Sequence, residues 1–198
     1  MNTSSLYRIG GIAAILGIVL MFAGDAIPAL LGIGLLLFGL FYYALDRFLG
    51  SSPLGLAAVG STVVGAIGLI LTGTTPTVIF NIFMVLAFML PALLAGLAAR
   101  GKAGFPRFLP IIGMVGGALG IVNAVVNIAG GGDYTNLSSP TLTLLSNLTY
   151  YPAALLVVVW LLWGGILLLR AKGVGAAQSR RSACAAPGDF SSSGTNVG

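Results

Sequence analysis

Residues 116–133 read GGALGIVNAVVNIAGGGD, an apolar stretch that carries two amide side chains, Asn123 and Asn127. The two asparagines lie one helical turn apart, so a helix places them on the same face. Three glycines fall on that face as well: Gly113, Gly116 and Gly120. A buried amide needs a hydrogen-bond partner, and small residues let a neighbouring helix approach closely. We therefore predict that this face points into a bundle of membrane helices.

Other residues of this segment and of the preceding one predict what surrounds this face. Val115, Leu119, Val122 and Val126 are assigned to a different face, which is expected to contact lipid. Asn81, in the preceding apolar segment, is the predicted partner of the two amides.

Composition predicts an all-α membrane protein. Of 198 residues, 58% are hydrophobic and only 7% are charged, with a mean hydropathy of +1.07. A soluble domain carries about 25% charged residues. The chain has no histidine and a single cysteine, Cys184. We expect no cofactor and no metal site, because histidine ligands, paired cysteine ligands and Ser-His or Cys-His pairs are excluded.

Six apolar segments have the length of about 20 residues that a transmembrane helix needs. They cover residues 6–24, 26–46, 54–73, 76–99, 107–129 and 149–170. The first also resembles a signal peptide, with Arg8 before an apolar run, but it lacks a convincing cleavage site and is taken as a retained span.

The basic residues predict the orientation of these spans. All nine fall on one side if both termini lie there: Arg8, Arg47, Arg100, Lys102, Arg107, Arg170, Lys172, Arg180 and Arg181. The positive-inside rule then places both termini in the cytoplasm. This topology accounts for the net charge of +5, so no nucleic-acid partner is expected.

The segments alternate in character and form three predicted hairpins. Spans one, three and five are rich in glycine and alanine, whereas spans two, four and six carry bulkier side chains. The pattern fits either an internal duplication, as in some transporters, or a general solution to helix packing. Residues 1–172 are predicted to form the membrane domain, and residues 173–198 a disordered cytoplasmic tail rich in Gly, Ala and Ser.

The polar residues of the spans gather at the predicted outer end. This candidate cluster contains Asn81, Asn123, Asn127, Asp25, Asp133, Tyr150 and Tyr151. Two interpretations stay open. The amides could bond across helices and fix their register, with the tyrosines at the membrane interface, or they could line a small outward-facing pocket.

The long loop before the last span carries further signals. Asn136 and Asn147 begin two glycosylation sequons. In "SSPTLTLL", Ser139 is expected to cap a helix that begins at Pro140. This helix would cover residues 140–147 and either lie on the bilayer surface or run into the last span.

The turn "ARGKAGFPRFLPIIGMVGGALGI" and the opening "YRIGGIAAILGIV" resemble uncharacterised bacterial multi-pass membrane proteins that are grouped as domains of unknown function. The resemblance covers about the first 130 residues. It implies a bacterial inner-membrane protein and transfers no functional residue.

We expect an integral inner-membrane protein without catalytic machinery that acts as a binding, accessory or assembly subunit. Its expected partners are the lipid bilayer and another membrane protein. The alternative is a small facilitator or transporter, with the outer cluster as its entrance. An enzyme acting on lipid is disfavoured, because Asp25 and Asp133 are the only outer acids and no histidine can serve as a base.

Overall fold

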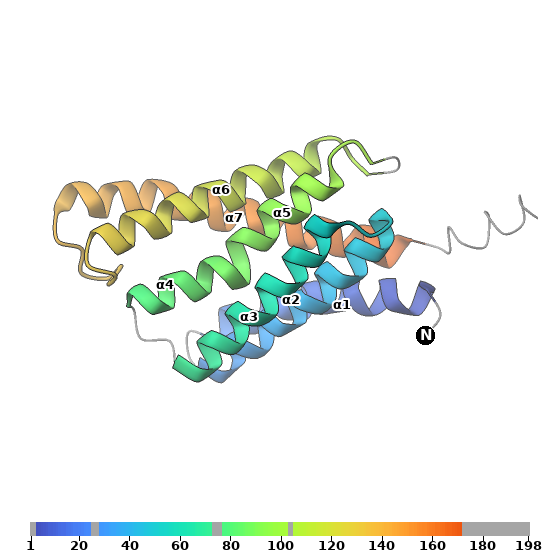
Figure 1. Cartoon of the computed structure of the whole chain (residues 1–198), viewed down its shortest axis with the longest axis horizontal. Coiled ribbons are helices and arrows are strands. Elements are labelled where there is room, and N and C mark those ends of the chain that lie inside the picture. Colours follow the sequence, from blue (N-terminus) through green and yellow to red (C-terminus); the bar gives the residue numbers. More distant parts are fainter. Residues whose placement is uncertain (1–2, 25–27, 73–76, 103–104, 172–198) are drawn as a thin grey trace, which may run out of the picture.

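The computed structural model describes residues 3–24, 28–72, 77–102 and 105–171, and every regular element among them is a helix (Figure 1). The elements are α1 (Thr3–Ala23), α2 (Pro28–Leu49), α3 (Pro53–Thr72), α4 (Val78–Met84), the π-helix η1 (Val85–Met89), α5 (Leu90–Ala99), α6 (Phe108–Ala129) and α7 (Pro140–Arg170). The predicted all-α class is confirmed. The tail at 173–198 and Asp25 lie outside the described residues.

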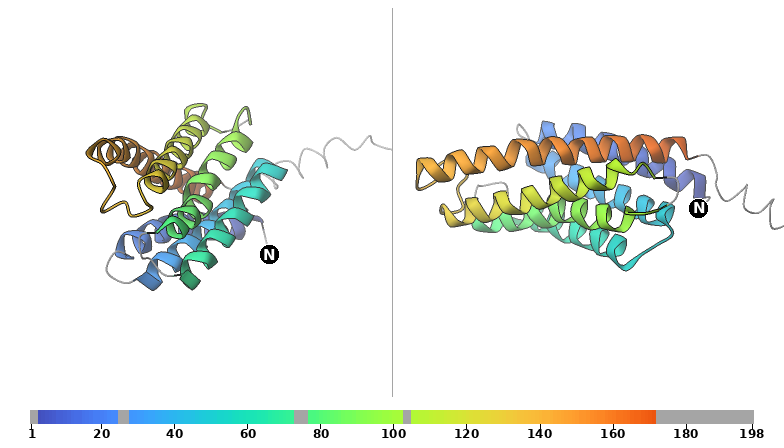
Figure 2. Two further views of the ribbon diagram at one scale, coloured as in Figure 1. Left: turned by 60° about the vertical axis from the view of Figure 1, so that its left-hand side comes forward. Right: turned by 90° about the horizontal axis from the view of Figure 1, so that it is seen from above.

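Six helices are long and apolar enough to cross a membrane, with α4, η1 and α5 together forming the fourth. At 1.5 Å per residue, a helix of 20 to 22 residues is about 30 Å long, which matches the hydrocarbon core. The last helix is longer. Its 31 residues run the length of the bundle as one continuous helix (Figure 2), so the helix predicted at 140–147 continues into the last span.

The bundle is built around α2. Each helix packs against the next along the chain, and α7 returns to contact α1. α2 contacts α1, α3, α5 and α7, and five of its apolar and aromatic side chains are almost completely buried: Leu35, Phe38, Phe41, Tyr42 and Leu45. The bulky side chains predicted for the second span therefore form the centre of the core.

The described basic residues lie at one end of the bundle, which we call the basic end. The start of α1, the α2–α3 turn, the α5–α6 turn and the end of α7 meet there (Figure 1). These segments carry Arg8, Arg47, Arg100, Lys102, Arg107 and Arg170. The α6–α7 loop lies at the opposite end, which we call the loop end. Which side of a membrane each end faces stays a prediction of the positive-inside rule.

A π-helical segment interrupts the fourth span just before Pro91. The backbone N–H of Leu90 donates to the carbonyl of Val85, five residues earlier. Proline has no N–H and its ring crowds the carbonyl four residues before it, so a wider turn accommodates Pro91 without breaking the helix.

Glycines hold this π-helical segment between two other helices. Gly65 of α3 contacts the backbone of Phe83 and Ala87, and Gly117 of α6 contacts the backbone of Met89 and Leu93. These contacts join backbone to backbone, so any side chain at either glycine would push the helices apart. The Gly- and Ala-rich spans thus pack closely, as their sequence predicts.

Replacing Gly117 by alanine is expected to lower stability. The added methyl group would lie 2.6 Å from the Met89 carbonyl oxygen and 2.7 Å from the Leu93 nitrogen. Overpacking of this kind costs about 1–3 kcal/mol. Thermal unfolding of the full chain in detergent, followed by circular dichroism, measures the change.

Gly60→Ala is the matched control for Gly117→Ala. Gly60 also lies inside a helix, but no atom lies within 4 Å of the position its methyl group would take. This change should leave the melting temperature unchanged or raise it, because alanine is a better helix former than glycine. Equal behaviour of the two variants would contradict the close α6–η1 contact.

Candidate functional site

The three asparagines predicted to interact do form one hydrogen-bonded cluster. Asn127 Nδ2 donates to Asn81 Oδ1 at 3.3 Å and to Asn123 Oδ1 at 3.1 Å. The side chains come from α4 and α6 and are all buried. The predicted amide contact between the fourth and fifth spans is therefore confirmed.

Two residues of α7 complete this cluster. Ser146 Oγ donates to Asn127 Oδ1 at 2.8 Å. Asn123 Nδ2 lies 3.1 Å from both Ser146 Oγ and Thr149 Oγ1 and 2.9 Å from the Ser146 carbonyl oxygen. We call Asn81, Asn123, Asn127, Ser146 and Thr149 the amide cluster. It joins α4, α6 and α7 near the loop end.

The donors of the three amides are all used within the protein, and each amide oxygen accepts one hydrogen bond. Asn81 Nδ2 donates to the carbonyl oxygens of Thr77 and Gly132, at 2.9 and 2.8 Å. Each amide nitrogen thus donates at least twice, and each amide oxygen accepts at least once. A ligand would have to displace these internal bonds, so the arrangement favours the interpretation in which the amides hold helices together.

Local sequence features place these residues opposite one another. Thr77 caps α4 by accepting from the N–H of Phe80, which puts Asn81 in the first turn. Ser139 caps α7 by accepting from the N–H of Leu142, and Pro140 follows, as predicted. Because α7 begins about nine residues before the predicted span, its additional turns bring Ser146 and Thr149 to α6.

Asp133 and Tyr151 make their contacts outside the amide cluster, and Asp25 is not among the described residues. Asp133 accepts from the backbone N–H and the hydroxyl of Thr135 in the α6–α7 loop. The Thr135 hydroxyl, followed by the backbone N–H of the same residue, lowers the pKa of the Asp133 carboxyl. Tyr150 and Tyr151 are 48% and 66% exposed and stack edge to face on each other. Their exposure suits the predicted position at a membrane interface.

One residue of the predicted lipid face of α6, Val126, was assigned wrongly. Val126, assigned to lipid, is buried with 7% of its surface exposed, whereas the adjacent Val125 is 61% exposed. Each helical residue advances about 100° around the axis, so Val126 lies only about 100° from Asn127 and stays at the edge of the packed face. Val115 and Val122 are exposed as predicted, and Leu119 is half-buried.

Sequence reasoning missed three other buried polar groups. Tyr42 Oη, Asp46 Oδ2 and Trp160 Nε1 make no hydrogen bond among the described residues. The Trp160 indole lies close to the Tyr42 hydroxyl, but without the geometry of a hydrogen bond. Asp46 uses its other oxygen, which accepts from the N–H of Ser52 at 2.8 Å and closes the α2–α3 turn. The i, i+4 spacing of Tyr42 and Asp46 on a helix was the available signal.

The described part of the chain contains no group of three or more His, Cys, Asp or Glu side chains that could hold a metal ion. Comparison with known proteins finds no matching family model, curated protein or solved structure. The assignment of function therefore depends on the contacts within this chain.

Replacing Asn127 by leucine is expected to destabilise the bundle by about 1–2 kcal/mol, because the buried side chains Asn81, Asn123 and Ser146 each lose a partner. Val125→Leu is the control, since that side chain is already exposed on the opposite part of the same helix.

Thermal unfolding in detergent measures both variants. If both Asn127→Leu and Val125→Leu have the melting temperature of the parent chain, the amide cluster does not stabilise the bundle. If Asn127→Leu instead raises the melting temperature, the amides lower the stability of the parent chain. This result would indicate that they serve to bind a ligand.

Proposed function

We propose that the chain is a non-catalytic subunit of an assembly in the inner membrane, where it binds another membrane protein. The observation that carries this proposal is that every amide donor of the amide cluster is used within the protein. The strongest polar feature in the bundle is used to join α4, α6 and α7. A site for chemistry or transport would keep some of these groups available for a substrate.

The charge distribution supports a membrane location with both termini in the cytoplasm. Six basic residues of the described chain lie at the basic end, and Asp133 lies in the loop at the other end. The resemblance of the α5–α6 turn to bacterial multi-pass proteins supports a bacterial inner membrane.

A facilitator of small solutes is the second candidate. The observation that favours it is the set of three buried polar atoms, Tyr42 Oη, Asp46 Oδ2 and Trp160 Nε1, that make no hydrogen bond among the described residues. Buried polar groups usually have partners, so an exception in a membrane bundle indicates a place where a solute or water could bind. Tyr42 and Asp46 lie in the half of α2 nearer the basic end, away from the amide cluster.

Extraction of the full chain in polymer-bounded native membrane discs tests the proposal. A binding subunit should elute with a second protein in a fixed ratio, measured by light scattering and by cross-linking mass spectrometry. The same chain in liposomes should leave the entry rates of glycerol and urea unchanged. A chain that elutes alone and accelerates solute entry would contradict the proposal and support the facilitator.

If solute entry is accelerated, Tyr42→Phe locates the route. This change removes only the hydroxyl group and keeps the ring that packs against Phe41. It should reduce entry if the solute passes the three unpartnered atoms, whereas Tyr7→Phe, in the same core but on α1, should have no effect.

A further inference from the structure

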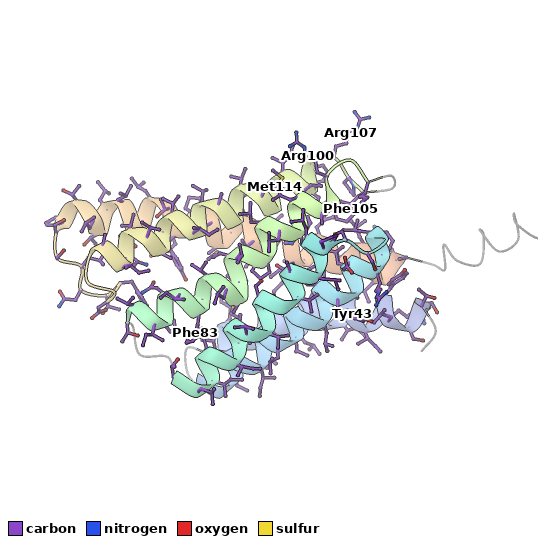
Figure 3. All side chains as sticks on the ribbon, viewed as in Figure 1. Tyr43, Phe83, Arg100, Phe105, Arg107 and Met114 are labelled. Atoms are coloured by element: carbon purple, nitrogen blue, oxygen red, sulfur yellow. The ribbon has the colours of Figure 1, made fainter. Side chains whose placement is uncertain are left out.

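A concave surface opens at the basic end, between the end of α5 and the start of α6. Its volume is about 570 Å³, and the lining side chains include Ala99, Arg100, Lys102, Phe105, Arg107 and Ile111. In Figure 3, Arg100 and Arg107 extend from the same side of the α5–α6 turn. Phe105 is buried and packs against Trp160 at 5.8 Å, so it forms a fixed floor beneath the charges. We call this surface the basic pocket.

The positive charge of the basic pocket is not neutralised by the described protein. Two carboxylates occur in the described residues, Asp46 and Asp133. Asp46 accepts from Ser52 in the α2–α3 turn, and Asp133 accepts from Thr135 in the α6–α7 loop. Three cations that share one concave surface without a described carboxylate attract anions to it.

The basic pocket continues into an apolar helix face. Arg107, Ile111 and Val115 follow one another at intervals of four residues, so they lie along one side of α6. Ile111 and Val115 are 58% and 45% exposed. The charges therefore lie at the end of a helix surface that faces the hydrocarbon region. Binding of a free anion needs only the charges. Binding of a lipid needs the charges next to an apolar face that continues from them along the helix.

We propose that the basic pocket binds an anionic phospholipid. Its phosphate lies against Arg100, Lys102 and Arg107, and its acyl chains run along α6 past Ile111 and Val115. Arginine suits this role because its guanidinium group donates several hydrogen bonds to phosphate oxygens in a fixed plane. The bound lipid would be fixed to the α5–α6 turn while other annular lipids exchange freely.

Native mass spectrometry of the full chain, released from detergent, tests this proposal. The parent chain should bind one palmitoyl-oleoyl phosphatidylglycerol more tightly than further copies, and more tightly than the phosphatidylcholine with the same acyl chains. A cation that lies against the anionic headgroup contributes about fivefold to the affinity, and this contribution falls off with distance from the headgroup. The double variant Arg100→Gln, Arg107→Gln should therefore weaken the first binding event by about 30-fold.

Arg8→Gln with Arg170→Gln is the control, because it removes two exposed charges from the same end outside the basic pocket. Its affinity for phosphatidylglycerol should change by less than about threefold. Circular dichroism and the melting temperature show that both double variants keep the parent fold.

Three results would overturn the proposal. The two double variants could lose affinity equally, which would indicate general surface attraction. The pocket variant could keep the affinity of the parent. Inorganic phosphate could displace the lipid at millimolar concentration, which would indicate a site for a free anion rather than for a phospholipid.

Discussion

The structure depends on the need of each amide in a membrane bundle to find a hydrogen-bond partner within the protein. Water cannot satisfy a polar group in the hydrocarbon region, and an unpaired group there costs several kcal/mol. Asn127 meets this requirement by bonding to Asn81, Asn123 and Ser146 at once. Since these residues belong to three different helices, the pairing fixes how α4, α6 and α7 lie relative to one another. The hydrogen bonds of this one side chain therefore fix the relative positions of these three helices.

Close glycine contacts provide the complementary constraint in the middle of the bundle. Lipid is as apolar as a leucine side chain, so membrane helices gain little from burying apolar groups against each other and depend on close packing. Gly65 and Gly117 bring α3 and α6 against the backbone of the fourth span, at and around the π-helical turn before Pro91. The hydrogen bonds orient the helices near the loop end, and the glycines set their separation.

Several features could be predicted because each depends on local sequence. Span length, the glycine and asparagine face of α6, the Ser139 cap and the Asn81–Asn127 contact follow from spacing and from the chemistry of single residues. The assignment of Val126 failed because a helix face has a gradual boundary, and which helices flank α6 decides where it lies. Ser146 and Thr149 were missed because the last span was predicted to begin at residue 149, and the helix expected at 140–147 could have been on the bilayer surface instead of in line with the span. The π-helical turn before Pro91 was not predicted. The basic residues of the α5–α6 turn were used only to predict topology, because whether they share one concave surface depends on how α5 packs against α6.

A double-mutant cycle on Asn127 and Ser146 tests most directly whether the amide cluster acts as a structural network. Asn127→Ala, Ser146→Ala and the double variant would be compared by the free energy of unfolding in detergent. The account predicts a coupling energy of about 0.6–1.7 kcal/mol for the bond that Ser146 Oγ donates to Asn127 Oδ1. The control pair Val125→Ala and Ser146→Ala, in which Val125 is exposed and does not contact the amide cluster, should show none. Additive effects of Asn127→Ala and Ser146→Ala would contradict the account, because they would mean that the two side chains do not stabilise each other.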